Sequence, residues 1–173
     1  MNNYIDFTPF GIVYHITLDV ACGSSRNVIK VKQNDLSRII KVYVEEGGKK
    51  LSTTIDDVSN DTITLRVQRP DGKLILSENN IEWDIEEGTR TFKGQEIPLT
   101  GEMLSASGRA CCDFLFKYRF TFGSTYEDYE FSTESFYIDI EPIPKETSQG
   151  TTTTPYNETQ SESISDSVTE VHV

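Results

Sequence analysis

Residues 110–122 read ACCDFLFKYRFTF, and this stretch decides the fold. Every second position from Ala110 to Phe122 carries a small or aromatic apolar side chain, while polar residues such as Asp113 and Lys117 stand between them. Successive side chains of a β-strand point to opposite faces, so a period of two is typical of a strand with one face on a core. The stretch therefore predicts a long, half-buried strand. The aromatic side chains could pack in the core or line a carbohydrate-binding groove, and the strict alternation fits core packing better.

The same period of two recurs along the chain in the runs 14–20, 40–44, 63–67, 81–85 and 136–140. Turn-forming residues follow several of these runs, among them Gly47-Gly48, Pro70-Asp71-Gly72 and Gly88. Short strands at this spacing predict a mainly β protein, folded as an antiparallel immunoglobulin-like β-sandwich.

One segment, residues 99–108, breaks the alternation. Thr100 stands where an N-cap residue would begin a helix, and Gly108 stands where a glycine would end it. We therefore expect one short helical turn that crosses between the sheets.

Composition divides the chain into three regions. Residues 14–142 hold nearly all the large apolar side chains and are expected to form the sandwich domain. Residues 143–173 are rich in Ser and Thr, acidic, and carry Tyr156 as their one aromatic side chain. Such a segment buries too little apolar surface to offset its backbone entropy, so we expect an extended tail. Residues 1–13 are expected to form an arm outside the sandwich that holds Tyr4, Phe7 and Phe10.

The charge balance excludes two classes of partner. The formal net charge is −12, from 16 Lys and Arg against 28 Asp and Glu. Binding to nucleic acid or to an anionic membrane surface depends on clustered Lys and Arg, so neither partner is expected. No run of 18 apolar residues is present that would insert into a membrane. The three cysteines lack the spacing of a zinc site or a disulfide framework, which predicts free thiols in a reducing cytoplasm.

Residues that could support catalysis are few. His15 lies on the polar side of the first alternating run, where a hydrogen-bonded or solvent-facing strand histidine is expected. Adjacent side chains of a strand diverge, so Cys111 and Cys112 should not form a redox pair, and Cys112 should be a small buried apolar residue. The sequence has no glycine-rich phosphate loop, no Gly-x-Ser-x-Gly elbow and no calcium loop. We therefore expect no enzymatic activity, no cofactor and no metal.

Four segments in a fixed order resemble one family. They are Lys30-Val31-Lys32-Gln33-Asn34-Asp35 followed by Ser37-Arg38, then Arg69-Pro70-Asp71-Gly72-Lys73, then Leu99-Thr100-x-x-Met103-Leu104-x-x-x-Gly108, and last Ser132-Thr133-x-x-Phe136-x-Ile138. Together they resemble the N-terminal domain of phage baseplate upper proteins, the BppU family. That family's pattern is a Lys-Gln-x-Asp strand entry, a Pro-Asp-Gly hairpin, a Leu-Thr-x-x-Met-Leu turn closed by Gly, and a final Thr-x-x-Phe strand. The resemblance spans about residues 16–142.

The resemblance implies a β-sandwich of tailed-phage virions that anchors a fibre or a receptor-binding protein to the distal tail. It implies a non-enzymatic structural role in the tail tip or baseplate, location in the virion after synthesis in the host cytoplasm, and contacts with other virion proteins. Virion rings and fibres repeat one contact by symmetry, so a homo-oligomer is expected. Each motif also has a purely structural interpretation: residues 33–35 can form an Asx-type turn, and Asp71-Gly72 can simply close a hairpin.

Two other functions stay open at this stage. The domain can instead decorate the head or neck of the virion or anchor a fibre there. It can also be a carbohydrate-binding module that contacts the host surface through the rings of Tyr126, Tyr129 and Phe131. These residues stand among acidic residues and are expected to be exposed. Longer family members continue into helical and docking regions, whereas this chain continues into its Ser/Thr-rich tail. The expected interaction residues are Tyr4, Phe7, Phe10, Gln33, Asp35, Arg38, Tyr126, Tyr129 and Tyr156.

Overall fold

The computed structural model describes residues 3–20, 24–54, 60–122 and 124–145. The chain divides into one compact unit over Met1–Ile143 and a second over Pro144–Val173, of which only Pro144 and Lys145 are described. The predictions for Cys22, for Tyr156 and for the tail beyond Lys145 therefore lie outside the described residues.

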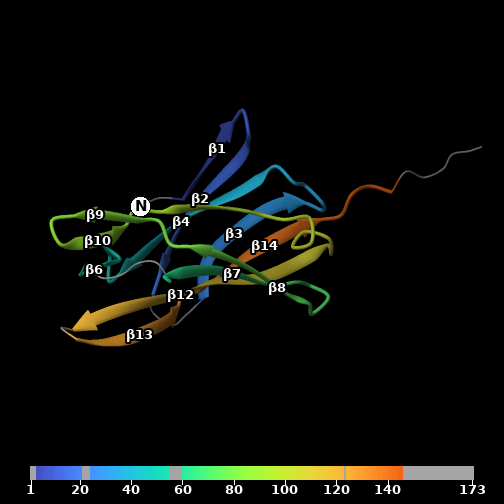
Figure 1. Ribbon diagram of the computed structural model, residues 1–173. Helices are drawn as coiled ribbons and strands as arrows, with labels where there is room; N and C mark the ends of the chain where they lie inside the picture. The colour runs from blue at the N-terminus through green and yellow to red at the C-terminus, as the bar shows by residue number, and fades with distance from the viewer. Residues whose placement is uncertain (1–2, 21–23, 55–59, 123, 146–173) are drawn as a thin grey trace, which may run out of the picture. The chain divides into compact units, whose positions relative to one another are not determined.

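The described residues are mainly strand and contain no helix. The strands are β1 (Tyr4–Thr8), β2 (Gly11–Asp19), β3 (Ser24–Lys32), β4 (Arg38–Glu46), β5 (Lys49–Lys50), β6 (Ser52–Thr54), β7 (Thr62–Gln68), β8 (Leu74–Asn80), β9 (Trp83–Glu86), β10 (Thr89–Phe92), β11 (Gln95–Pro98), β12 (Gly108–Phe122), β13 (Thr125–Ser132) and β14 (Ser135–Glu141). Figure 1 shows their arrangement in the first unit. The predicted β class is confirmed.

These strands form three sheets. A five-stranded sheet has the order β1-β2-β4-β11, with β5 paired to β4, and a six-stranded sheet has the order β3-β14-β12-β7-β8, with β13 paired to β12. A small sheet follows the order β6-β10-β9. One hydrophobic cluster contains buried side chains from both large sheets, among them Ile16 and Val42 from one and Phe114 and Ile138 from the other. The two large sheets therefore pack face to face as a sandwich.

The predicted core row is buried from Ala110 to Phe116. Ala110, Cys112, Phe114 and Phe116 of β12 are buried, and Tyr118 is partly exposed. The side chains of Phe120 and Phe122 lie outside the described part. Cys111 is exposed on the opposite face, as the alternation predicts. Burial raises the pKa of the Cys112 thiol, so this side chain stays protonated and acts as an apolar residue.

Two strand pairs differ from the predicted antiparallel arrangement. β2 pairs with β4 in parallel, and β3 pairs with β14 in parallel. β3 leaves the sheet of β2 and joins the other sheet, so β4 returns to the first sheet in the direction of β2. A period of two tells which face of a strand is buried but carries no information about the neighbouring strand, which explains the difference.

The expected helical turn is a single turn. The Leu104 N–H donates to the Thr100 carbonyl at 3.3 Å, and the Met103 N–H donates to Thr100 Oγ1 at 3.4 Å. Thr100 therefore caps this turn in the way its position predicts. Met103 and Leu104 are fully buried, so the turn fills one end of the core.

Candidate functional site

The N-terminal arm extends the five-stranded sheet. β1 pairs antiparallel with β2, with Tyr4 opposite His15 and Thr8 opposite Gly11. Phe7 and Phe10, near the turn between the two strands, are 80% and 88% exposed. The arm thus presents two phenylalanine side chains to solvent at one end of the sheet.

His15 fastens the arm to the sheet. Its Nδ1 lies 3.0 Å from the hydroxyl of Tyr43, and its Nε2 lies 3.0 Å from Oδ2 of Asp6. The ring of Tyr4 stacks on the imidazole with a centroid distance of 3.9 Å. His15 is buried, and both of its ring nitrogens have partners. The interpretation of His15 as a hydrogen-bonded strand histidine is confirmed.

Replacing His15 should therefore loosen the arm. His15→Ala removes two hydrogen bonds and one stacked ring, together worth on the order of 1–2 kcal/mol, which corresponds to about tenfold faster amide exchange. Hydrogen-exchange mass spectrometry of the full chain should show this increase in β1. Protection in β8, an outer strand of the other large sheet, should stay the same. Equal acceleration in β1 and β8 would mean that His15 stabilises the whole domain and not the arm.

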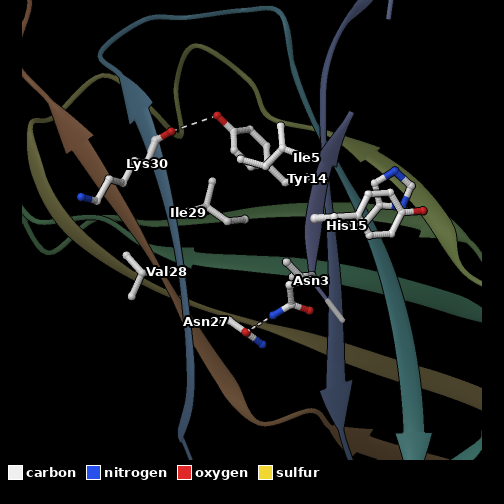
Figure 2. A pocket seen from close by; sticks show the side chains of 10 residues that line it. Asn3, Ile5, Tyr14, His15, Asn27, Val28, Ile29 and Lys30 are labelled. Atoms are coloured by element: carbon white, nitrogen blue, oxygen red, sulfur yellow. Dashed lines mark hydrogen bonds between the residues drawn. The ribbon is translucent and has the colours of Figure 1, made fainter. Parts of the chain in front are cut away.

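A groove opens beside the arm, between β1 and β2 on one side and β3 on the other (Figure 2). Its volume is about 350 Å³, and its apolar lining includes Ile5, Val28 and Ile29. The Tyr14 hydroxyl donates to the carbonyl of Lys30 at 2.9 Å across the groove. Its one histidine, His15, already binds Asp6 and Tyr43. The lining fits contact with apolar side chains better than proton transfer.

Gln33, Asp35 and Arg38 stabilise a loop that leads from β3 to β4. Gln33 Nε2 donates to the Ser105 carbonyl at 2.5 Å, and Asp35 Oδ1 accepts from the Ser37 N–H at 3.2 Å. Arg38 Nε donates to Asp35 Oδ2 at 2.7 Å. The Asx-type turn predicted at Asp35 is therefore present.

The second and third motifs bind each other. Arg69 pairs with Asp71 inside the Pro-Asp-Gly hairpin and donates through Nη1 to the Glu102 carbonyl at 3.0 Å. Lys73 Nζ lies 2.6 Å from Oε1 of Glu102. The hydrogen bond from Arg69 lowers the pKa of Asp71, and that from Lys73 lowers the pKa of Glu102. The hairpin and the Thr100 turn thus hold together through charge-assisted hydrogen bonds.

Gly108 closes the third motif against the second. Its φ is +123°, and a Cβ built on it would lie 3.0 Å from Cβ of Pro70. A side chain there would be strained and would crowd the hairpin, so the backbone conformation requires glycine.

The fourth motif covers the start of β14, whereas Gly108 pairs with Ile140 near the end of that strand. Thr133 Oγ1 accepts from the N–H of Phe114 at 3.1 Å, and the ring of Phe136 stacks on that of Phe114 at 5.7 Å. The Glu134 N–H donates to the carbonyl of Asp19 in the opposite sheet at 2.8 Å. The Glu134–Asp19 hydrogen bond thus joins the two large sheets, and the contacts of Thr133 and Phe136 hold the start of β14 against β12.

An exposed apolar surface borders the first motif. The Ile12 N–H donates to the carbonyl of Ser37 at 2.9 Å, so the β1–β2 turn lies against the loop that follows β3. Gly11 contacts Ser37, and Phe10 and Leu36 are the residues immediately before them in the sequence. Leu36 is 71% exposed. We call Phe7, Phe10 and Leu36 the apolar end. Leu36 was not predicted, because it lies in a loop without periodicity.

The β12–β13 hairpin carries the other predicted aromatic residues. Tyr126 and Tyr129 are exposed, and the guanidinium of Arg119 lies 3.9 Å from the ring centroid of Tyr126. Tyr126 and Tyr129 are three residues apart on one strand, so their rings lie on opposite faces and share no stacking surface. The prediction that Phe131 is exposed is wrong: its ring stacks on Phe116 at 5.0 Å and packs against the core.

A buried ion pair was missed by the sequence analysis. Asp61 and Arg90 are almost completely buried, with Arg90 Nη1 2.5 Å from Asp61 Oδ2. The sequence pattern could not pair them, because Asp61 and Arg90 are 29 positions apart, one just before β7 and the other in β10. Among the described residues there is no group of three His, Cys, Asp or Glu side chains placed to hold a metal ion. In the same residues, no helix is long and apolar enough to cross a membrane.

Comparisons with known proteins were made at the level of family, sequence and structure. No family model and no curated protein matches the chain. Among solved structures, the chain is similar to the N-terminal domain of phage TP901-1 ORF48. The two are 19% identical, the match covers 75% of this chain and 98% of that one, and the TM-score is 0.45.

Proposed function

We propose that this protein is a structural component of a phage virion, placed in the tail tip or baseplate, where it connects neighbouring virion proteins. The observation that carries the proposal is the contact between motifs far apart in the sequence. Gln33 of the first motif binds the loop of the third at Ser105, and Arg69 of the second binds Glu102 of the third. Three of the four segments that resemble baseplate upper proteins thus bind one another within one folded domain.

The apolar end is the surface that we assign to a neighbouring virion protein. Phe7, Phe10 and Leu36 expose large apolar side chains on the β1–β2 turn and on the loop against it, and exposed apolar surface on soluble proteins commonly marks interaction sites. The loop beneath is held rigid by the Asp35–Arg38 pair. In this proposal Gln33, Asp35 and Arg38 shape the docking surface, while Phe7, Phe10 and Leu36 enter the interface.

The role in this proposal is mechanical and not catalytic. His15 hydrogen-bonds within the arm, to Asp6 and Tyr43, and burial keeps the Cys112 thiol protonated, which fits a structural role for both side chains. The carbohydrate-binding alternative is not favoured, because Tyr126 and Tyr129 lie on opposite faces of β13.

The location of the chain in the particle tests the proposal. Mass spectrometry of purified virions should detect the chain, and cryo-electron microscopy should place its density at the tail tip or baseplate. Density on the head or neck would instead support the decoration or fibre-anchor role. Absence of the chain from purified virions would contradict both placements.

Changing the apolar end should block incorporation into the particle. The variant Phe7→Ser/Phe10→Ser/Leu36→Ser is expected to fold normally, because all three side chains are exposed. Its amount in purified virions should fall at least tenfold, since about 1.4 kcal/mol of lost apolar burial already corresponds to tenfold weaker binding. The matched control is Leu74→Ser/Leu76→Ser, which changes two exposed leucines of β8. Normal incorporation of the triple variant would exclude the apolar end as the docking surface.

A further inference from the structure

The six-stranded sheet has a stepped edge. β14 pairs with Gly108–Cys112 of β12, whereas β13 pairs with Leu115–Phe122 of the same strand. β7 also pairs with Leu115–Lys117, so β13 lies on the side of β12 opposite β7, which is the side of β14. β3 lies beyond β14. On this side, β14 and then β3 lie beside one half of β12, whereas β13 alone lies beside the other half.

In the described part of the chain, neither outer strand of this edge has a strand paired to its second side, and on β3 the Lys30 carbonyl accepts a hydrogen bond from the Tyr14 side chain. There, β3 pairs only with β14, and β13 pairs only with β12. The backbone groups on a free strand edge can form hydrogen bonds with a further strand. The stepped edge can thus accept a strand beside β3 and another beside β13.

The two outer strands carry opposite charge. β3 contains Arg26, Lys30 and Lys32 and no acidic residue, although the chain as a whole has a net charge of −12. β13 contains Glu127, Asp128 and Glu130 and no basic residue. β8, the outer strand on the opposite side of this sheet, has a single charged residue, Glu78. Opposite charge therefore concentrates on the stepped edge.

The charges of the two strands also share a face of the sheet. Lys30 and Lys32 are exposed and alternate with the buried residues Ile29 and Val31. On β13, Phe131 lies on the core side, against Phe116, so Asp128 and Glu130 lie on the outer side. Asp128 pairs with Arg119, and Glu130 lies 3.5 Å from Lys117. A lysine from a neighbouring strand would extend these rows of alternating charge.

We propose that two copies of this chain join edge to edge about a two-fold axis perpendicular to the six-stranded sheet. β13, β14 and β3 all run opposite to β12, since β3 is parallel to β14. The two-fold axis reverses strand direction, so β3 of one copy lies antiparallel to β13 of its partner. The acidic β13 and the basic β3 then meet twice, as a two-fold interface requires.

The step in the edge fits this symmetry without a gap. Over one half of the interface, the strands between the two copies of β12 are β13, the partner's β3 and the partner's β14. Over the other half they are β14, β3 and the partner's β13. Each half holds the same number of strands, so the long strands of the two copies keep one spacing throughout. The shape, the strand directions and the charges of the edge are all self-complementary.

Light scattering coupled to size-exclusion chromatography of the full chain tests the dimer. Wild-type protein should have the mass of a dimer. Lys30→Glu/Lys32→Glu should place like charges at both contacts and weaken association at least tenfold, and Asp128→Lys/Glu130→Lys should do the same. The matched controls Lys49→Glu/Lys50→Glu and Glu86→Lys/Glu87→Lys change exposed residues of β5 and of the β9–β10 hairpin and should stay dimeric.

An equimolar mixture of the two disrupted variants provides the sharpest test. In the mixed dimer, one contact joins an acidic β3 to a basic β13, and the other joins the two native strands, so the dimer should return. Wild-type association should also weaken between about 0.05 and 0.5 M NaCl, because salt screens exposed charges. This measurement does not depend on the folding of any variant. Wild-type protein that is monomeric, a dimer unaffected by either reversal, an unrestored mixture, or a ring or fibre would each overturn the proposal.

Discussion

Asp61→Ala is expected to lower the free energy of unfolding by about 3–5 kcal/mol, the usual loss when one member of a buried ion pair is removed. Asp61 and Arg90 expose almost no surface, so the alanine variant leaves the Arg90 guanidinium buried without its counter-charge. Burying an uncompensated charge costs far more than the hydrogen bond itself.

Asp61 also organises the surrounding strands. Its Oδ2 accepts from Trp83 Nε1 at 3.0 Å, and its Oδ1 accepts from the backbone N–H of Arg119 at 2.9 Å. Arg90 lies between aromatic rings, 4.9 Å from Trp83 and 5.4 Å from Tyr118. The substitution therefore removes the Asp61 contacts that link Trp83 of β9 and Arg90 of β10 to β12, and leaves only the hydrogen bond from Arg90 Nη2 to the Arg119 carbonyl among the polar contacts named for this cluster.

Urea unfolding followed by tryptophan fluorescence measures this effect, because Trp83 is the single tryptophan of the chain and binds Asp61 directly. Asp139→Ala, which removes one partner of the solvent-exposed pair with Arg109, should have a far smaller effect. The double variant Asp61→Ala/Arg90→Met should be more stable than Asp61→Ala alone, because it also removes the unpaired charge. A double variant less stable than the single one would show that the charge of Arg90 is not the source of the loss.

Periodicity made the strands of the core predictable. In β12 from Ala110 to Phe116, and likewise in β7 around Leu65 and in β14 around Ile138, each apolar residue of the alternating pattern is buried. The turn at Gly47-Gly48 was equally predictable. Both glycines have positive φ and join the paired residues Glu46 and Lys49, as a two-residue hairpin requires. Local preferences suffice for such features.

Other features depend on contacts that the sequence does not encode locally. The apolar end depends on the contact of Gly11 and Ile12 with Ser37, which places the β1–β2 turn against the loop after β3. The exposure of Phe131 was predicted wrongly because its acidic neighbours suggested a surface strand, whereas its register with Phe116 turns its ring toward the core. Contacts between segments that are distant in the sequence decided both cases.

Phe116→Ala is expected to destabilise the domain by about 3–5 kcal/mol, the range for removing a fully buried phenylalanine side chain. The ring of Phe116 meets Phe92 of β10 edge to face at 5.3 Å and stacks on Phe131 of β13 at 5.0 Å. Alanine would leave a cavity bordered by strands of two sheets, which cannot collapse toward each other without disturbing their ladders. The loss should therefore fall in the upper part of this range.

Chemical unfolding with two matched variants tests this expectation. Phe10→Ala removes an equal volume from an exposed side chain and should change stability by less than about 0.5 kcal/mol. Phe116→Leu keeps most of the volume and should recover much of the loss. The dependence of the unfolding free energy on denaturant concentration should stay the same in all three variants, because the surface exposed on unfolding is unchanged. A loss in Phe116→Ala no larger than that in Phe10→Ala would mean that the contact between Phe116 and Phe92 does not hold the small sheet against the six-stranded sheet.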